Sequence, residues 1–212
     1  ASFKTLFFWG GFDYVTDGWY LREGADMFHR LFKWAPGYRY ATHRPPTVYD
    51  ENGRDLRSGR WLSPRILAQR KIFLYHYSIV FPKQVDEKVT YYAAAPFGEY
   101  SAGVRDWAQR NFLSTISKPF KIHNMHTHPS WLKHFRGRHP RQIGYLRADI
   151  ESGRLPGVAL RPYVDVEALL KSPLYKTGRF MLDKLYSLYA RYPRVRWYAE
   201  QCAQSTCYDS RR

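Results

Sequence analysis

The stretch that decides the fold spans residues 71–81 and reads KIFLYHYSIVF. An almost unbroken run of aromatic and β-branched residues is typical of a strand that is covered on both faces. We therefore predict that Lys71–Phe81 is a central strand of a sheet. His76 and Ser78 are two residues apart, so they share one face of this strand and form a polar notch in it.

Turn-forming residues divide the sequence before this strand into two β-hairpins. Ala35-Pro36-Gly37 has the composition of a type II turn, in which proline sets the first φ and glycine accepts a positive φ. Asn52-Gly53 is the pair favoured in tight hairpins. The four strands predicted to flank these turns are Met27–Trp34, Tyr38–Thr42, Thr47–Asp50 and Arg54–Arg57.

A connector stiffened by proline, His43-Arg44-Pro45-Pro46, joins the two predicted hairpins. The prolines remove two amide donors and push the preceding residue out of the helical region, so we expect an extended segment with displayed side chains. Arg44 offers a planar fork that suits a diphosphate. A surface arginine beside a structural turn is the alternative.

Beyond residue 100, apolar residues recur at intervals of three and four, which predicts helices. These helices are Ser101–Phe112, with Ser101 as the cap, a helix from Pro140 that stops at Gly153, Asp165–Lys171, and Arg179–Arg191. The predicted fold class is therefore α/β, with a mixed sheet and hairpins in residues 1–100 and helices in residues 101–212. At 212 residues and 44% hydrophobic, the chain is expected to form a single domain.

The composition is strongly basic, with 34 Lys and Arg against 18 Asp and Glu and a formal net charge of +16. The resulting positive potential attracts phosphates, nucleic acid or anionic lipid, and charge alone does not choose among them. No apolar run approaches the roughly 18 residues of a membrane span, and the start has no signal-peptide pattern. We expect a cytoplasmic protein, with peripheral contact to the inner membrane face as a further option.

His76 is the sharpest candidate among the chemically active residues. A neutral imidazole on a strand can ligate a divalent metal or hold a phosphate oxygen, and the hydroxyl of Ser78 can bind the same group. A core histidine satisfied by a hydrogen bond is the alternative. The residues predicted to bind substrate are His43, Arg44, Thr47, Tyr75, Ser78 and Lys83.

Carboxylates are scarce before the first predicted hairpin, where one of Asp13, Asp17, Glu23 and Asp26 could deprotonate a hydroxyl as general base. Asp13 and Asp17 are the predicted catalytic residues. Asp17 precedes Gly18, and a turn or cap residue is its other interpretation. The sequence has no GxSxG, no glycine-rich phosphate loop and no CxxC pair. The sequence therefore gives no support to a serine hydrolase, a P-loop protein or a zinc finger.

Three further segments keep more than one interpretation. A basic stretch with five of the eight histidines, from His123 to His139, suits a metal cluster, a loop that binds phosphate or acceptor, or a solvated loop. The basic and apolar residues of Arg179–Arg191 fit a helix on an anionic membrane or one packed on its own domain. Cys202 and Cys207 are expected to be free thiols, and a small disulfide or half a zinc site are the alternatives.

Several segments in series suggest a family. The succession RLFKWAPGYRYATHRPPTV, the Asn-Gly hairpin and YHYSIVFPKQVDEKVTYY resembles the half that follows the metal motif in bacterial family 2 glycosyltransferases with the glycosyltransferase-A fold. The later HPSWLKHFRGRHPRQI is similar to the tail of the same proteins. The resemblance covers roughly Phe8 to Glu151, which makes this chain the acceptor-side half.

The resemblance implies transfer of a sugar from a nucleotide-diphosphate donor to a hydroxyl of a saccharide or lipid-linked acceptor, with Mn²⁺ or Mg²⁺. His76 would complete the metal or diphosphate site, and the connector His43–Thr47 would lie near the acceptor. Such enzymes carry an Asp-x-Asp in an earlier βαβ half, which this sequence lacks. The nearest matches, Asp149-Ile150-Glu151 and Asp165-Val166-Glu167, fit helix ends better. Either the sequence is a fragment of such an enzyme, or a partner chain supplies the missing half, or the function has changed.

The alternative function is a non-enzymatic basic module that binds RNA or single-stranded nucleic acid. Its support is the combination of Trp, Tyr and Arg side chains, which stack on bases and hold phosphates. No RNA-binding motif accompanies them, and most of the aromatic residues belong to strands predicted to be buried. We therefore expect the glycosyltransferase function first.

Overall fold

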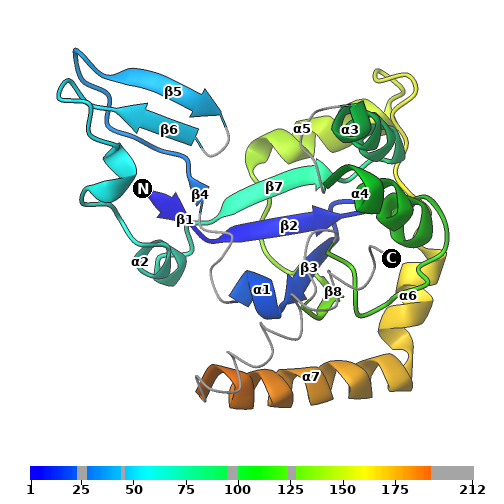
Figure 1. Ribbon diagram of the computed structural model, residues 1–212. Coiled ribbons are helices and arrows are strands. Elements are labelled where there is room, and N and C mark those ends of the chain that lie inside the picture. The colour runs from blue at the N-terminus through cyan, green and yellow to red at the C-terminus, as the bar shows by residue number, and fades with distance from the viewer. Residues whose placement is uncertain (23–27, 44–45, 95–99, 124–127, 192–212) are drawn as a thin grey trace. The chain divides into compact units, whose positions relative to one another are not determined.

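The structure is a computed structural model that describes residues 1–22, 28–43, 46–94, 100–123 and 128–191. The chain divides into two compact units. The first unit comprises Ala1–Leu6 and Leu21–His76, and the second comprises Phe7–Tyr20 and Tyr77–Arg212. Strands and helices occur together (Figure 1), which confirms the predicted mixed α/β content.

A four-stranded sheet has the order β7 (Leu74–Ile79), β2 (Thr5–Trp9), β3 (Tyr14–Gly18) and β8 (Ser130–His134). β3 is antiparallel to both of its neighbours. β7 is parallel to β2, because the hydrogen bonds from Leu74 N to Lys4 O and from Gly10 N to Ile79 O advance in the same direction along both strands. The sheet is therefore mixed.

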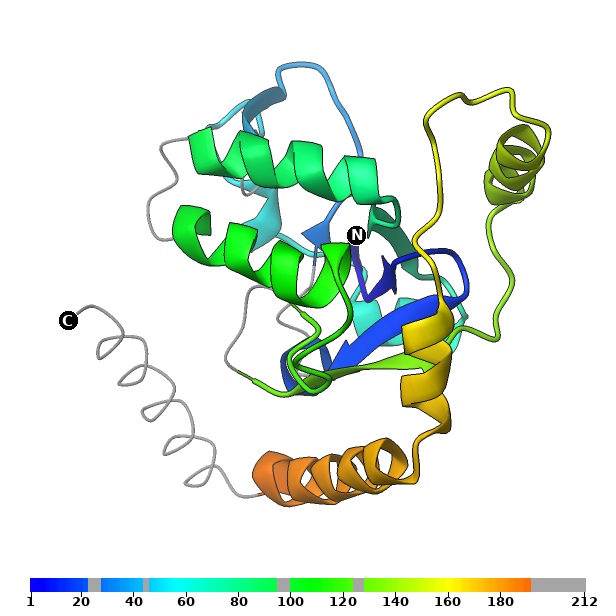
Figure 2. The same cartoon turned by 90° about the vertical axis from the view of Figure 1, so that its right-hand side faces the viewer.

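The helices of the second unit follow β7 in the chain. They are α3 (Pro82–Ala94), α4 (Tyr100–Ala108) with a π-helical continuation (Gln109–Leu113), α5 (Arg141–Glu151), α6 (Val164–Lys171) and α7 (Pro173–Arg191). α3 and α4 pack side by side (Figures 1 and 2). α7 leaves α6 at an angle at Ser172 (Figure 2).

The core of the second unit forms around β8. Trp131 and Leu132 are neighbours and so point to opposite faces, and both are fully buried, which means that both faces of β8 are covered. The Tyr175 hydroxyl from α7 accepts a hydrogen bond from Leu132 N at 2.8 Å and lies 3.3 Å from Leu132 O. Burial raises the pKa of Tyr175 to about 12, so this hydroxyl stays protonated at neutral pH.

The first unit is built from short elements. Strand β1 (Ser2–Phe3) pairs with β4 (Phe28–His29), and β5 (Arg39–His43) pairs with β6 (Pro46–Tyr49). A 3-10 turn (Leu56–Ser58) and α2 (Pro64–Gln69) follow β6, whereas α1 (Trp19–Arg22) spans the boundary with the second unit. Asp55 caps the 3-10 turn and Ser63 caps α2 through their side chains.

The strand predicted at Lys71–Phe81 exists, but its predicted central position is wrong. β7 stands at one end of the strand order, and all six of its residues are only half-buried. The chain bends directly after it, because Pro82 begins α3 in the position where proline suits a helix. The aromatic and β-branched residues continue past the end of β7 to the start of α3. The sequence pattern therefore resembled that of a longer, buried strand.

The two turns predicted in the first unit are confirmed, but their flanking strands pair differently. Gly37 and Gly53 have φ values of +79° and +76°, the positive range for which glycine was expected. Nevertheless β4 pairs with β1, so the hairpin predicted around Gly37 is wrong. After Asn52-Gly53 the return strand is reduced to one bridge, between Tyr49 and Asp55, because the 3-10 turn begins at once.

The connector predicted over residues 43–46 lies partly outside the described residues, and its two ends, His43 and Pro46, are antiparallel partners in β5 and β6. The predicted helices beyond residue 100 are confirmed, although α4 begins at Tyr100, before its predicted cap, and α7 begins at Pro173. α2 and α3 lie in the half that was expected to be β-rich. None of the helices in the described part of the chain has the length and apolar character needed to cross a membrane.

Candidate functional site

Asp17, one of the two predicted catalytic residues, lies near the end of β3 and is held from two sides. Its Oδ2 is 3.1 Å from Nζ of Lys133 on β8, and its Oδ1 accepts a hydrogen bond from the amide of Gly18 at 2.8 Å. The Asp17 side chain is only 13% exposed, whereas that of Lys133 is 44% exposed. The carboxylate is thus fixed in position at the margin of the core.

The register of the sheet explains this ion pair. Asp17 is opposite Trp131, so Lys133, two residues along β8, is its diagonal neighbour on the same face. Gly18 is opposite Ser130, and a Cβ on Gly18 would lie 2.6 Å from Pro129 O. Only glycine permits this close approach of β3 to β8, and the approach is what brings Asp17 and Lys133 together.

Asp13, the second predicted catalytic residue, precedes the start of β3. Its carboxylate forms an ion pair with Nη2 of Arg147 on α5 at 2.8 Å, and its side chain is 54% exposed. The Arg147 guanidinium lies 5.0 Å from the centre of the Phe12 ring, which is itself buried. Asp13 therefore joins the loop before β3 to α5, and it is much more open to solvent than Asp17.

His139, the last of the five histidines in the basic stretch, lies beside this loop. His139 Nδ1 shares a hydrogen bond of 2.9 Å with the hydroxyl of Tyr77, and its ring lies 5.1 Å from that of buried Phe8. Burial lowers the pKa of His139, and the nearby charge of Arg147 lowers it further, while Asp13 opposes the shift. The imidazole is therefore neutral at physiological pH.

Tyr14, Glu167 and His134 form a third polar group, between β3, α6 and β8. The Tyr14 hydroxyl donates to Glu167 Oε1 at 2.6 Å, and His134 Nε2 lies 3.8 Å from the same oxygen. Burial raises the pKa of Tyr14, and the hydrogen bond to Glu167 and its negative charge add to this effect. Hydrophobic patterning placed Glu167 at a helix end but gave no sign of this partner.

The residues predicted to bind substrate are distributed over both units. Thr47 on β6 is buried, and its hydroxyl is hydrogen-bonded to that of Thr42 at 2.8 Å, so it holds the β5–β6 hairpin together. Arg44 lies outside the described residues. The others lie on described elements: His43 on β5, Tyr75 and Ser78 on β7, and Lys83 on α3, where it lies 4.0 Å from Glu87.

The residues described for this chain do not make a complete metal site. His76, the predicted metal ligand, lies on β7 with both neighbouring side chains half-buried. Within the described ranges, no three His, Cys, Asp or Glu side chains are grouped so that they could hold a metal ion. Binding of Mn²⁺ or Mg²⁺ through His76 stays a prediction.

The histidine-rich stretch is not a single cluster. His134 belongs to β8, whereas His139 packs near Phe8. His123 contacts the Phe7 ring edge-on at 5.3 Å, and His128 lies 6.5 Å from the ring of Tyr20. These histidines pack on aromatic side chains of the second unit, and His126 lies outside the described residues.

The two acidic pairs that come nearest to an Asp-x-Asp motif serve structural contacts. The Asp165 carboxylate binds the guanidinium of buried Arg161 and accepts from Ile116 N. Asp149 is paired with Arg154 at 2.6 Å on the surface. Their assignment to helix ends is consistent with these contacts. No known protein family, curated protein or solved structure matches this chain.

Proposed function

We propose that this chain is the acceptor-side part of a glycosyltransferase that moves a sugar from a nucleotide-diphosphate donor to a hydroxyl of a saccharide or lipid-linked acceptor. The observation that carries the proposal is the fixed carboxylate of Asp17, 13% exposed and held by Lys133 and Gly18 N. A general base has to be held at a defined position and still reach the proton that it takes. Asp17 is held at a defined position, and a small part of its side chain is still exposed.

The proposed reaction is a displacement at the anomeric carbon of the donor sugar. The acceptor oxygen forms a bond to that carbon, its proton passes to the Asp17 carboxylate, and the bond from the carbon to the diphosphate oxygen breaks. The electron pair of that bond leaves with the nucleotide diphosphate. Positive side chains stabilise such a departing anion, and the net charge of +16 provides a surrounding potential of the right sign.

Asp13 is the second candidate for the base, and its surroundings make it the weaker one. Its carboxylate is more than half exposed and is paired with Arg147, itself partly exposed. Exposed ion pairs fix a side chain only weakly, at about 0–1 kcal/mol. We therefore assign the proton transfer to Asp17 and a role in ordering the loop before β3 to Asp13.

We also propose that α7 contacts an anionic membrane surface, where a lipid-linked acceptor would be found. One stripe of α7, Leu174, Met181, Leu185 and Leu188, is exposed, although Tyr175 and Tyr189 on the adjoining stripe are buried in the second unit. Lys184 and Arg191 border the exposed stripe. An apolar stripe bordered by cations is the pattern of helices that lie in the interface of anionic bilayers.

The function is tested by mixing the chain with UDP-sugars and GDP-sugars, with Mn²⁺ and saccharide acceptors, and measuring thermal stability and release of nucleotide diphosphate. We expect a rise in melting temperature with at least one saccharide acceptor, because the chain is proposed to hold the acceptor side. A single-stranded oligonucleotide is run in parallel. Stabilisation by the oligonucleotide at moderate salt, with none by any nucleotide sugar or saccharide, would overturn the proposal in favour of the nucleic-acid module.

Membrane contact is tested separately, by sedimentation with vesicles. We expect binding to vesicles rich in phosphatidylglycerol and little binding to neutral phosphatidylcholine vesicles. Met181→Glu and Leu185→Glu should each reduce binding, because they place a negative charge in the apolar stripe. Val164→Glu is the matched control, since Val164 is an exposed apolar residue of α6 outside the stripe. An equal loss in all three variants would contradict a role for the stripe.

A further inference from the structure

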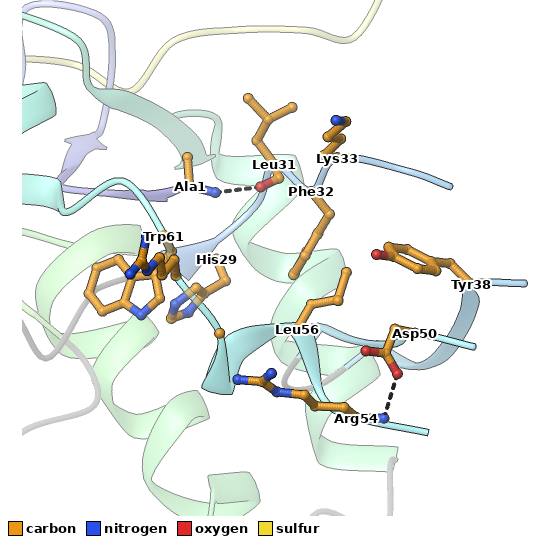
Figure 3. A pocket seen from close by; sticks show the side chains of 12 residues that line it. Ala1, His29, Leu31, Phe32, Lys33, Tyr38, Asp50, Arg54, Leu56 and Trp61 are labelled. Atoms are coloured by element: carbon orange, nitrogen blue, oxygen red, sulfur yellow. Dashed lines mark hydrogen bonds between the residues drawn. The ribbon is translucent and has the colours of Figure 1, made fainter. Parts of the chain in front are cut away.

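The first unit contains a pocket of about 310 Å³ that no predicted site residue lines. Its walls come from Ala1, the segment after β4, the Tyr38 position before β5, and the loop from Asp50 to Trp61 (Figure 3). The pairing of β1 with β4 and the turn at Asn52-Gly53 bring these segments together. The pocket is therefore a product of the fold of this unit alone.

The lining of the pocket carries uncompensated positive charge. Lys33, Arg54 and Arg60 all contribute to the wall. The lining contains one carboxylate, Asp50, and its Oδ1 already accepts hydrogen bonds from the backbone amides of Asn52 and Arg54, at 3.0 and 2.8 Å. The three cations therefore leave the pocket with a net positive potential.

Two further carboxylates follow Asp50 in this loop, Glu51 and Asp55, and neither lines the pocket. Asp55 is bound by the guanidinium of Arg57 through both Nε and Nη2, at 3.0 and 2.6 Å from Oδ2. This contact lowers the pKa of Asp55, and the positive charge of Arg57 neutralises its carboxylate. A negatively charged group entering the pocket would thus meet lysine and arginine side chains and little repulsion.

Apolar and aromatic side chains form the rest of the pocket. Figure 3 shows Phe32, Leu56 and Tyr38 directed toward a common space, with Trp61 on the opposite side. Trp61 is 40% exposed, and its ring is supported edge-on by His29 at 5.0 Å. Burial lowers the pKa of His29, so this support is a neutral imidazole at physiological pH. Such walls suit the apolar face of a ring-shaped ligand.

We propose that this pocket binds a saccharide that carries a phosphate group, with the phosphate on Arg54 and Arg60 and the sugar ring between Trp61 and Tyr38. Arginine binds phosphate with two parallel hydrogen bonds, which makes it the residue suited to this role. The inference rests on the proposed function, because it names a class of saccharide for it. The phosphate belongs either to a soluble sugar phosphate or to the head group of a lipid-linked saccharide.

Binding is measured by tryptophan fluorescence and by calorimetry with glucose 1-phosphate, glucose and inorganic phosphate as probes. We expect glucose 1-phosphate to bind at least tenfold more tightly than either fragment, because only it engages both parts of the pocket. Trp61→Phe should remove most of the fluorescence change while keeping the fold. Equal affinity for glucose and glucose 1-phosphate would overturn the proposal.

The cations are tested with Arg54→Gln and Arg60→Gln, and Arg65→Gln is the matched control. Arg65 is an exposed arginine of α2 in the same unit that does not line the pocket. We expect each pocket variant to weaken glucose 1-phosphate binding about tenfold or more, with the control unchanged. An equal loss of affinity in the Arg65→Gln control would mean non-specific attraction by charge and would contradict the proposal.

The source of the phosphate is distinguished by comparing soluble glucose 1-phosphate with vesicles that contain a lipid-linked saccharide diphosphate. The source of the phosphate is the ligand that the chain binds more tightly, provided that Arg60→Gln removes this difference in affinity. The binding assay is independent of sugar transfer. Binding without transferase activity would count against the proposed function and leave the pocket in place, whereas transfer without phosphate-dependent binding would overturn the pocket and leave the function.

Discussion

Asp17 on β3 and Lys133 on β8 form an ion pair of 3.1 Å across the register of an antiparallel strand pair. The pair is asymmetric, because the carboxylate is mostly buried and the ammonium group is nearly half exposed. The carboxylate is held by the amide of Gly18 as well. This relationship distinguishes Asp17 from the more exposed Asp13 and leads to the first prediction.

Asp17→Asn should lower the rate of sugar transfer by about 10²-fold or more, because an amide cannot take the acceptor proton. The fold should persist, since the side-chain oxygen of asparagine can still accept from Gly18 N. Asp149→Asn, at an exposed pair with Arg154, is the control and should keep full activity. Initial rates and circular dichroism check both. If Asp17→Asn keeps full activity, or if only Asp13→Asn loses activity, then Asp13 and not Asp17 is the general base.

Arg161→Met should destabilise the second unit by about 3–5 kcal/mol, the cost of removing one partner of a buried charge pair. The Arg161 guanidinium is bound to Asp165 and to Phe112 O, and it lies 5.0 Å from the Trp9 ring centre. Urea denaturation gives the free energy of unfolding. Arg154→Met is the control, because its ion pair is at the surface, and it should cost less than about 1 kcal/mol. Similar losses in both variants would contradict a special role for Arg161.

Local sequence signals predicted the turns and helices better than the strand partners. Gly37 and Gly53 take the positive φ that their turns required, and α5 stops near Gly153 at a φ of +71°. Strand pairing depends on contacts between distant residues, which local signals do not contain. Ser2 became the partner of His29 across 27 positions, and this displaced the hairpin predicted around Gly37.

The candidate site was predicted only in part, for the same reason. Scarcity of carboxylates pointed to Asp17, but Lys133 is more than a hundred residues away, and only the β3–β8 register unites them. The Tyr77–His139 contact likewise joins two segments without a shared motif. The run of basic and aromatic residues around Trp61 gave no spacing signal that a pocket forms there, since its walls come from four separate segments.

His139 should make the stability of the second unit depend on pH below about 6.5. Its pKa in the folded chain lies below the ordinary value of 6.5, so the unfolded chain binds the proton first as the pH falls. The stabilisation by neutral His139 is therefore complete above pH 6.5 and is lost as the pH falls from there through the folded pKa. We expect the free energy of unfolding of the wild type to fall more steeply below pH 6.5 than that of His139→Gln. Parallel curves from urea denaturation at each pH would show that His139 does not contribute.

Gly18→Ala should destabilise the protein by about 1–3 kcal/mol, because the new methyl group would lie 2.6 Å from Pro129 O and 2.9 Å from Ser130 Cα. These are backbone atoms, so they can yield only by separating the end of β3 from β8. Gly103→Ala is the matched control: Gly103 is an exposed residue of α4 with no atom within 4 Å of the added Cβ. It should stabilise the chain by about 0.5–1 kcal/mol, since alanine favours the helix. Because Asp17 adjoins Gly18, only Gly18→Ala should also lower sugar transfer. If Gly18→Ala keeps both stability and activity, then Asp17 does not depend on the close approach of β3 to β8.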